Sequence, residues 1–372
     1  GAQVEEDVEG LARGSVERTV RDLRLVCETT HAEVSRAVGS ALRVAKDALA
    51  RGGGVQPTAE VVTWKAVNQL DKSTVEVKLP KLAIGATPIP QTNDFGTRLP
   101  LVDEASRLTG AKVTLFQRMN ERGDMLRVAT SVANAKGERA IGTYIPATEP
   151  SGKPNAVLAA VLAGNRYDGR AFVVDAWYLT SYEPLRDASG AVSGVLFVGI
   201  RLDALDSIRA AIAETRLGAT GYVAAYGASG TQRGKLLMGP DAAAEGKSFL
   251  EEPDATGKPW LSALLDAAKA LDGPALARFD RQAAGKGGAV DARLGAVTYF
   301  EPWDFVILAD LSRAEALEAS AGMNRTLLFG ALAVLLVTLA LLAGAATLAR
   351  RAALRIARPV EEMAGAAERI AR

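Results

Sequence analysis

Residues 15–50 carry a helical pattern of apolar and charged positions. Apolar residues recur at steps of three, four or their multiples, and charged residues cover the other face, which predicts one long amphipathic helix. The apolar positions are Val16, Val20, Leu23, Val26, Val34, Val38, Leu42, Ala45 and Leu49. The glycines of Arg51–Pro57 end the pattern, so we assign residues 1–57 to this helical region. A helix of this length cannot bury its own stripe, so the stripe must lie along another domain or a second copy of itself.

Two related halves follow this helix, between Thr109 and Leu317. Each half begins with Thr-Gly, a short apolar strand, a polar turn and a second strand, and continues through Gly-Lys-Pro into a helix. Each half closes on strands beside a Glu-Pro pair, Glu183-Pro184 or Glu301-Pro302, which we interpret as a feature of the fold. Because tight turns join consecutive strands, the pattern predicts a duplicated α+β domain with antiparallel sheets.

One uncharged segment, Thr326–Ala349, is long enough to cross a bilayer as a helix. Buried core helices rarely lack polar residues over such a length, so we assign residues 325–349 to a transmembrane helix. A cluster of arginines follows it and marks the C-terminal side as cytoplasmic: Arg350, Arg351, Arg355 and Arg358. We therefore expect a protein of the inner (cell) membrane, with the lipid bilayer as a partner, residues 1–324 extracytoplasmic and residues 350–372 cytoplasmic. An export signal or a first membrane helix is expected before residue 1.

Composition excludes several classes of function. The chain has 372 residues, of which 48% are apolar and 23% charged, which suits two globular domains with additional segments. A net charge of +1 without a basic stripe gives no case for nucleic acid. Cys27 and His31 are each the only residue of their type, which excludes an internal disulfide, a cysteine-based zinc site and a His-pair metal site. No metal and no cofactor are expected.

The rival classes are a membrane-anchored enzyme and a structural ectodomain. Most pairs of nucleophile and base are unavailable, because the single Cys and the single His both lie on the N-terminal helix, where we interpret His31 as a solvated or packed residue. The glycines of the stretch 227–234 serve a hairpin turn and not a phosphate-binding loop. A purely structural ectodomain would leave the cytoplasmic coil without a purpose. The expected protein is therefore not an enzyme.

Several phrases in a fixed order resemble the bacterial double-Cache sensors, especially the Cache-fusion type of methyl-accepting chemotaxis receptors. The phrases, spread over residues 61–319, are "VTWKAVNQ", "TGAKVTLFQR", "MLRVATSV", "GERAIGTYI", "YEPLRDASGAVSGVLFVGI", "TGYVAAY" and "TYFEPWDFVI". The tail resembles the opening of a HAMP relay, with Pro359 followed by Glu362. The resemblance implies PAS-like modules, a parallel homodimer and sensing of a small molecule on the periplasmic side.

The expected fold class is α+β, with two tandem PAS-like (Cache) modules on antiparallel sheets between the long N-terminal helix and one transmembrane helix. The first, membrane-distal module is assigned to residues 58–203 and the second, membrane-proximal module to residues 204–319. Residues 350–372 are assigned to the start of a cytoplasmic HAMP-like coil. In double-Cache sensors the distal module usually holds the ligand, which points to the first module here.

Arg127 is the leading candidate for a ligand contact. Its strand neighbours Leu126, Val128 and Ala129 are apolar, and a guanidinium buried there needs an anion or a set of carbonyls as its partner. A ligand carboxylate, from a small carboxylic acid or an amino acid, is a natural bidentate partner. The alternatives are a structural ion pair, for which Asp175 is a candidate, and a side chain that points to solvent.

The stretch Ala171–Ile200 reads as a β-hairpin whose first arm is rich in aromatic residues. Along a strand, Tyr178, Thr180 and Tyr182 share one face, and Asp175 and Trp177 share the other. We favour the tyrosine face as a pocket wall, while Asp175 lines the same pocket only if a bulge intervenes; a plain core is the alternative. The second-tier candidates are Trp64, Thr143, Tyr144 and Tyr167.

The sequence thus predicts extracytoplasmic sensing of a small molecule and transmembrane signalling. A chemotaxis receptor is the favoured interpretation, because the resemblance points to it. The sensor region of a histidine kinase or of a diguanylate cyclase is the alternative, since the output domain would lie after residue 372.

Overall fold

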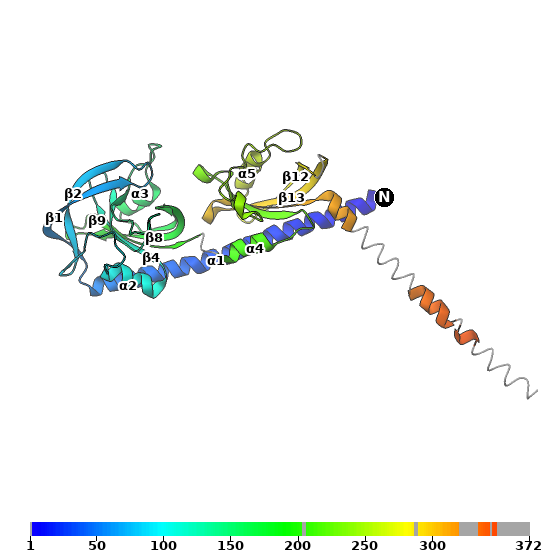
Figure 1. Cartoon of the computed structure of the whole chain (residues 1–372), viewed down its shortest axis with the longest axis horizontal. Coiled ribbons are helices and arrows are strands. Elements are labelled where there is room, and N and C mark those ends of the chain that lie inside the picture. The colour runs from blue at the N-terminus through cyan, green and yellow to red at the C-terminus, as the bar shows by residue number, and fades with distance from the viewer. Residues whose placement is uncertain (1, 203–205, 286–288, 320–333, 343, 348–372) are drawn as a thin grey trace, which may run out of the picture.

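The computed structural model describes residues 2–202, 206–285, 289–319, 334–342 and 344–347. One helix, α1 (Ala2–Arg51), runs alongside two α+β modules that lie one after the other on the same side of it (Figure 1). The helix ends where Gly53 and Gly54 adopt positive φ angles of 95° and 75°, which glycine reaches without steric cost.

The first module is built on a nine-stranded sheet in the order β3-β2-β1-β6-β5-β4-β9-β8-β7. The strands are β1 Val55–Asn68, β2 Thr74–Ile84, β3 Thr87–Pro88, β4 Lys112–Arg118, β5 Met125–Thr130, β6 Thr143–Ile145, β7 Tyr167–Val173, β8 Ala176–Arg186 and β9 Val192–Arg201. Helix α2 (Pro100–Thr109) packs with α1 on one face of this sheet, and α3 (Ala156–Leu162) covers the other.

The second module has a five-stranded sheet in the order β11-β10-β14-β13-β12. Its strands are β10 Tyr222–Gly227, β11 Leu236–Met238, β12 Ala277–Ala284, β13 Val290–Phe300 and β14 Phe305–Ser312. Helix α4 (Asp206–Glu214) precedes β10, and α5 (Leu261–Lys269) packs on the sheet face that is turned away from α1. Short 3₁₀ turns connect the strands: η1 Gly230–Gln232, η2 Ala242–Ala244 and η4 Glu301–Trp303.

The two sheets share one topology, which confirms the duplication inferred from the sequence. In chain order, strands β4, β5, β7, β8 and β9 of the first sheet take the same places as β10, β11, β12, β13 and β14 of the second. The prediction of purely antiparallel sheets fails at one point, because β1 and β6 pair in parallel through Val67 and Thr143. This pair joins the long β1–β2 hairpin to the repeated core, and the described strands of the second module include no counterpart of that hairpin.

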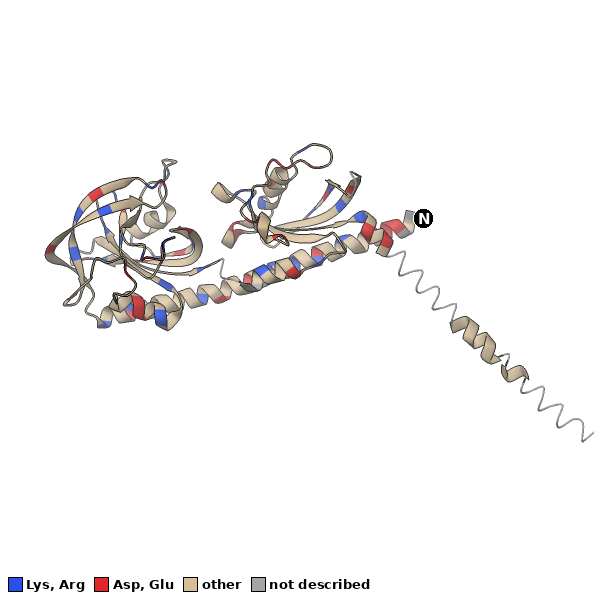
Figure 2. Ribbon diagram, viewed as in Figure 1, with Lys and Arg blue, Asp and Glu red and all other residues tan. Residues whose placement is uncertain are grey.

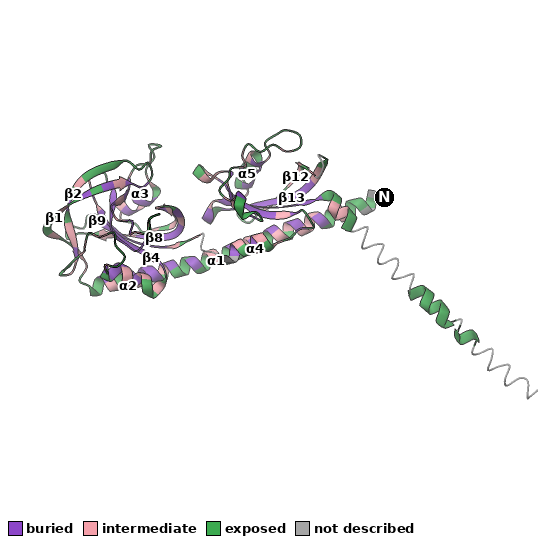
Figure 3. Cartoon of the chain, viewed as in Figure 1, coloured by how far each residue is buried: buried purple, intermediate pink, exposed green. Residues whose placement is uncertain are grey.

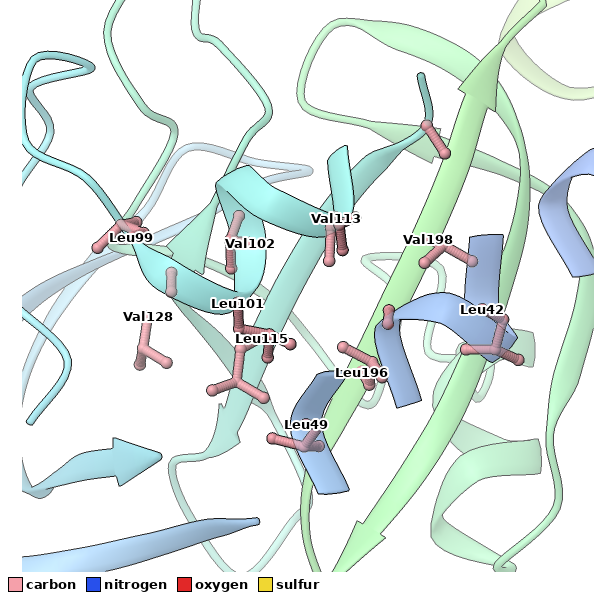
Figure 4. Packing of buried hydrophobic residues seen from close by; sticks show 14 of the residues in the cluster. Leu42, Leu49, Leu99, Leu101, Val102, Val113, Leu115, Val128, Leu196 and Val198 are labelled. Atoms are coloured by element: carbon pink, nitrogen blue, oxygen red, sulfur yellow. The ribbon is translucent and has the colours of Figure 1, made fainter. Parts of the chain in front are cut away.

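The apolar stripe of α1 divides between the two modules, as the burial colours show (Figure 3). Its N-terminal half packs on the second module, and its C-terminal half, with Leu42 and Leu49, packs on the first module beside Leu115, Leu196 and other core residues (Figure 4). The stripe was predicted to pass through Val26, but that side chain is 37% exposed and its neighbour Cys27 is buried instead. Both residues fit a helical spacing from Leu23, and only the position of the second sheet selects between them.

Charged residues are spread along α1, and several of them pair with the modules (Figure 2). Arg13 reaches Asp280 of β12 at 2.8 Å, and Lys46 pairs with Glu183 of β8. Charged residues of α1 outside the buried stripe therefore add ion pairs to both modules.

The two modules contact each other through Arg170 of β7. Its guanidinium donates to the carbonyl of Trp303 at 2.6 Å and to the carboxylate of Asp304 at 3.1 Å, and it stacks 3.9 Å from the ring of Trp177. Both members of the ion pair are mostly buried, with 15% and 18% of their side chains exposed. Partial burial reduces solvent screening, so the pair contributes more than an ordinary surface pair.

We expect a double-mutant cycle on this pair to return a coupling energy of about 1–2 kcal/mol. The variants are Arg170→Met, Asp304→Asn and the double substitution, and the measurement is the free energy of unfolding in urea. Additive effects of the two substitutions would show that the contact adds nothing to the docking of the modules.

About half of the predicted membrane segment, 325–349, lies outside the described residues. Within the described part of the chain, no helix combines the length and the apolar character needed to cross a membrane. Residues 334–342 and 344–347 are helical and exposed in this structure. The predicted HAMP-like coil at 350–372 lies entirely outside the described residues.

Candidate functional site

Arg127 lies in the middle of β5, with its side chain on the sheet face covered by α3. Its strand neighbours divide between the faces: Met125 packs with the α3 side, and Leu126 packs with the α1 side. A bulge in the β4–β5 ladder directly follows Arg127, because Phe116 pairs with Arg127 whereas Leu115 pairs with Ala129. Bulges re-aim side chains beside functional sites, and this one leaves both Val128 and Ala129 on the α1 side.

The guanidinium of Arg127 is enclosed but poorly paired. The residue is 1% exposed, its Nη1 donates to the hydroxyl of Thr143, and its Cζ lies 5.0 Å from the centroid of the Phe116 ring. Its Nε has no hydrogen-bond partner, and no acidic side chain of the described residues lies within 4 Å of its nitrogens. Burial lowers the pKa of Arg127 to about 10, and the nearby Tyr182 and Tyr178 oppose this change only in part.

Arg139 shows what a structural arginine looks like in the same module. It is also almost fully buried, but its two Nη atoms donate to both carboxylate oxygens of Asp103 at 2.7 and 2.9 Å. Its remaining hydrogen bonds go to the carbonyls of Asp94, Thr97 and Thr130. Every nitrogen of Arg139 thus has a partner, whereas Arg127 carries a buried positive charge without a counter-charge.

Tyr178 and Tyr182 share one face of β8, as the alternation predicted, and this face lies near Arg127. Tyr178 and Tyr182 are both 2% exposed and pack with Phe116 on the α3 side, while Leu179 packs on the α1 side. The centroid of the Tyr182 ring lies 4.9 Å from that of Phe197 and 6.1 Å from that of Tyr167. Burial raises the pKa of Tyr167 and of Tyr182.

Thr180 shares this face, but its hydroxyl is already engaged. It donates to the carbonyl of Gly169 at 2.7 Å and so fastens β8 to the edge strand β7. Its contribution to the site is therefore to hold the strand that carries the two tyrosines.

Asp175 and Trp177 lie away from Arg127, at the cleft between the two modules. Asp175 is exposed in the turn between β7 and β8, and the ion pair with Arg127 that was the alternative to ligand binding is not formed. Asp175, Trp177 and Arg170 line a cleft of about 250 Å³ between the two modules. Asp175 could reach the tyrosine face only through a bulge, and the one irregularity in the β8–β9 ladder lies far from it, at Leu185.

Trp64 and Tyr144 lie on the opposite face of the sheet from Arg127. Both pack in the cluster that joins the first sheet to α1 and α2, and they are 5% and 9% exposed. The structure therefore brings together Arg127, Tyr178, Tyr182 and Tyr167, and it separates Trp64, Tyr144 and Asp175 from them.

Two further residues complete the site. Phe116, which sequence reasoning left out, lies under the guanidinium, and Thr143 accepts from it while donating to the carbonyl of Ala140 at 2.9 Å. An apolar strand residue such as Phe116 carries no signal of its own before the pairing of β4 with β5 is known. Phe116 also lines an open hollow of about 1000 Å³, together with residues of the β4–β5 turn and the β8–β9 turn.

This arrangement suits binding better than catalysis. It offers one unpaired cation, phenol groups and apolar walls, which match a small molecule with a carboxylate and an apolar body. Within the described ranges, no group of three His, Cys, Asp or Glu residues is placed to hold a metal ion.

A family model matches most of the chain. Residues 2–326 match the Cache 3/Cache 2 fusion domain. Among curated proteins, none matches the chain.

A comparison with solved structures returns sensory domains of chemotaxis receptors, at low sequence identity. The sensory domain of the Campylobacter jejuni chemoreceptor Tlp3 (CcmL) is 13% identical, covers 85% of this chain and 99% of its own, and gives a TM-score of 0.44. The ligand-binding domain of Tlp3 in complex with 4-methylisoleucine is 14% identical, covers 82% of this chain and 92% of its own, and gives a TM-score of 0.42. A methyl-accepting chemotaxis protein from Vibrio parahaemolyticus is 21% identical, covers 31% of this chain and 73% of its own, and gives a TM-score of 0.24.

Proposed function

The chain belongs to the Cache 3/Cache 2 fusion family, and from this premise we propose that its first module binds a small monocarboxylate through Arg127. Cache domains are sensory modules that bind ligands and are not catalytic. The observation that carries the proposal is the buried, uncompensated charge of Arg127, set against the fully paired Arg139 in the same module. A charge kept in a fold at such a cost is typical of a functional site.

The surroundings favour an acid without an amino group. The α-ammonium group of an amino acid would need an acidic side chain as its partner. Among the described residues, no acidic side chain lies within 4 Å of the Arg127 guanidinium, where the ligand carboxylate would bind. Apolar side chains of the α3 side, among them Ile145, Val157 and Phe197, would enclose the hydrocarbon part. The phenol groups of Tyr178 and Tyr182 would contact the carboxylate or its neighbouring carbon atoms.

We further propose that binding is extracytoplasmic and that the signal crosses the inner membrane through residues 325–349. The protein would act as a parallel homodimer, with a chemotaxis receptor as the favoured output and a kinase or cyclase as the alternative. The coupling requires that the ligand bind one state of the module better than the other, because equal affinity for both states shifts nothing.

The test is a thermal-shift screen of the full chain in detergent micelles with a matched trio of 4-methylpentanoate, its amide and leucine. We expect the carboxylate to stabilise the protein, by about 2.7 kcal/mol at one hundred times its Kd, because it binds the folded state alone. The amide lacks the charge, and leucine adds an ammonium group, so both should give smaller shifts. Stabilisation by the amide equal to that by the acid would contradict recognition of the carboxylate.

A further inference from the structure

His31 links α1 to the second module through one hydrogen bond and two ring contacts. Its Nδ1 accepts a hydrogen bond from the indole Nε1 of Trp303 at 3.1 Å. The imidazole lies edge-on to the rings of Phe300 and Trp303, with centroid distances of 6.1 and 6.0 Å. An imidazole that accepts at Nδ1 is neutral and carries its proton on Nε2.

Trp303 is the point at which α1 and both modules meet. It is 3% exposed and packs in the cluster that joins the second sheet to the N-terminal half of α1. Its indole donates to His31, and its carbonyl accepts from Arg170 of the first module at 2.6 Å. A change at the His31 contact therefore acts on a residue that both modules share.

Several charged and titratable groups line the hollow beside His31. They are Arg24 and Glu28 of α1, Lys269 and Asp272 at the end of α5, Tyr299 of β13 and Glu301 of η4. Arg24 pairs with Glu28 at 2.8 Å and lies 5.8 Å from the centroid of the same Phe300 ring that His31 contacts. Burial is what lowers the pKa of His31 below its usual 6.5, and burial raises the pKa of Tyr299 to about 12, so this phenol stays neutral.

We propose that the chain senses acidity as a second input, with His31 as its proton-binding site. Protonation places an N–H on Nδ1, which then can no longer accept from Trp303. The buried indole N–H loses its partner, and a second positive charge stands beside Arg24 among aromatic rings. Both changes weaken the attachment of α1 to the second module at Trp303.

The direction of the pH effect follows from the lowered pKa. Between that lowered value and about 6.5, the unfolded chain binds more protons at His31 than the folded chain does. The contribution of His31 to the free energy of unfolding is therefore complete above about pH 6.5, and it falls as the pH drops through this window. The proposal does not depend on the Arg127 site, because its test uses no ligand.

The test exploits the fact that the chain has one histidine. Deuterium exchange at the imidazole C2 position, followed by mass spectrometry on the full chain in detergent micelles, reports the titration of His31 alone. We expect a midpoint below pH 6.5 that moves upward in Trp303→Phe, because the indole hydrogen bond favours the neutral ring.

The same samples report on α1 through exchange of its backbone amides around residue 31. After correction for intrinsic rates, we expect exchange to rise several-fold from pH 7.5 to pH 5.5 in the wild type. In His31→Gln it should stay flat, since the glutamine oxygen accepts from Trp303 at either pH. An equal rise in both proteins, or a midpoint at or above pH 6.5, would overturn the proposal.

Discussion

Replacing Arg127 with methionine is expected to raise the free energy of unfolding of the ligand-free protein by about 1–3 kcal/mol. A pKa lowered from 12.5 to about 10 corresponds to a cost of roughly 3 kcal/mol for keeping the charge inside the fold. Methionine fills a similar volume without a charge, and it gives up only the contacts with Thr143 and Phe116. The measurement is urea denaturation of the full chain in detergent micelles.

Arg139→Met is the matched control, because it removes an equally buried arginine from the same module. That arginine balances the carboxylate of Asp103 and three carbonyl groups, so its loss should lower the free energy of unfolding by about 3–5 kcal/mol. If both substitutions destabilise the protein alike, Arg127 is a structural residue and the argument for a binding role fails.

Replacing Asp310 with asparagine should destabilise the second module by about 3–5 kcal/mol. Its side chain is fully buried, and its two oxygens accept from Arg293 at 2.6 Å and from Arg281 at 2.7 and 2.9 Å. Removing the negative charge leaves the two largely buried guanidinium groups with one amide oxygen in its place, and Asp291 then remains the carboxylate partner of Arg293 alone. Thermal unfolding followed by circular dichroism measures the loss.

Asp266→Asn provides the surface control in the same module. Asp266 pairs with Arg233 at 3.0 Å, but its side chain is 67% exposed, so the substitution should change stability by less than about 1 kcal/mol. Equal effects at Asp310 and Asp266 would show that the buried network contributes no more than a solvent-exposed pair.

Local patterns predicted much of the fold. The helical period placed α1 and most of its buried stripe, because a helix presents the same face every three or four residues. The alternation along β8 placed Tyr178 and Tyr182 on one face and Leu179 on the other. The repeated phrases predicted two modules of equal topology, since each phrase corresponds to a strand or a turn.

The errors arise where the answer depends on residues far apart in the sequence. Asp175 was placed in a strand, but Val174 takes a positive φ of 59° and the chain turns there instead. Trp64 and Tyr144 are residue types that often line pockets. The alternation along a strand does not indicate which face of the sheet a ligand would contact. The contact between His31 and Trp303 spans 272 residues, so no local signal could reveal it.

The central claim is that Arg127 binds the carboxylate of the ligand. Isothermal titration of wild type and of Arg127→Met with the carboxylate that stabilises the wild type most tests it directly. We predict that the variant, although folded and at least as stable, binds at least one hundred times more weakly, in line with the loss of a buried charged hydrogen-bonding partner. Equal affinity of the two proteins would contradict the account and place the ligand elsewhere in the chain.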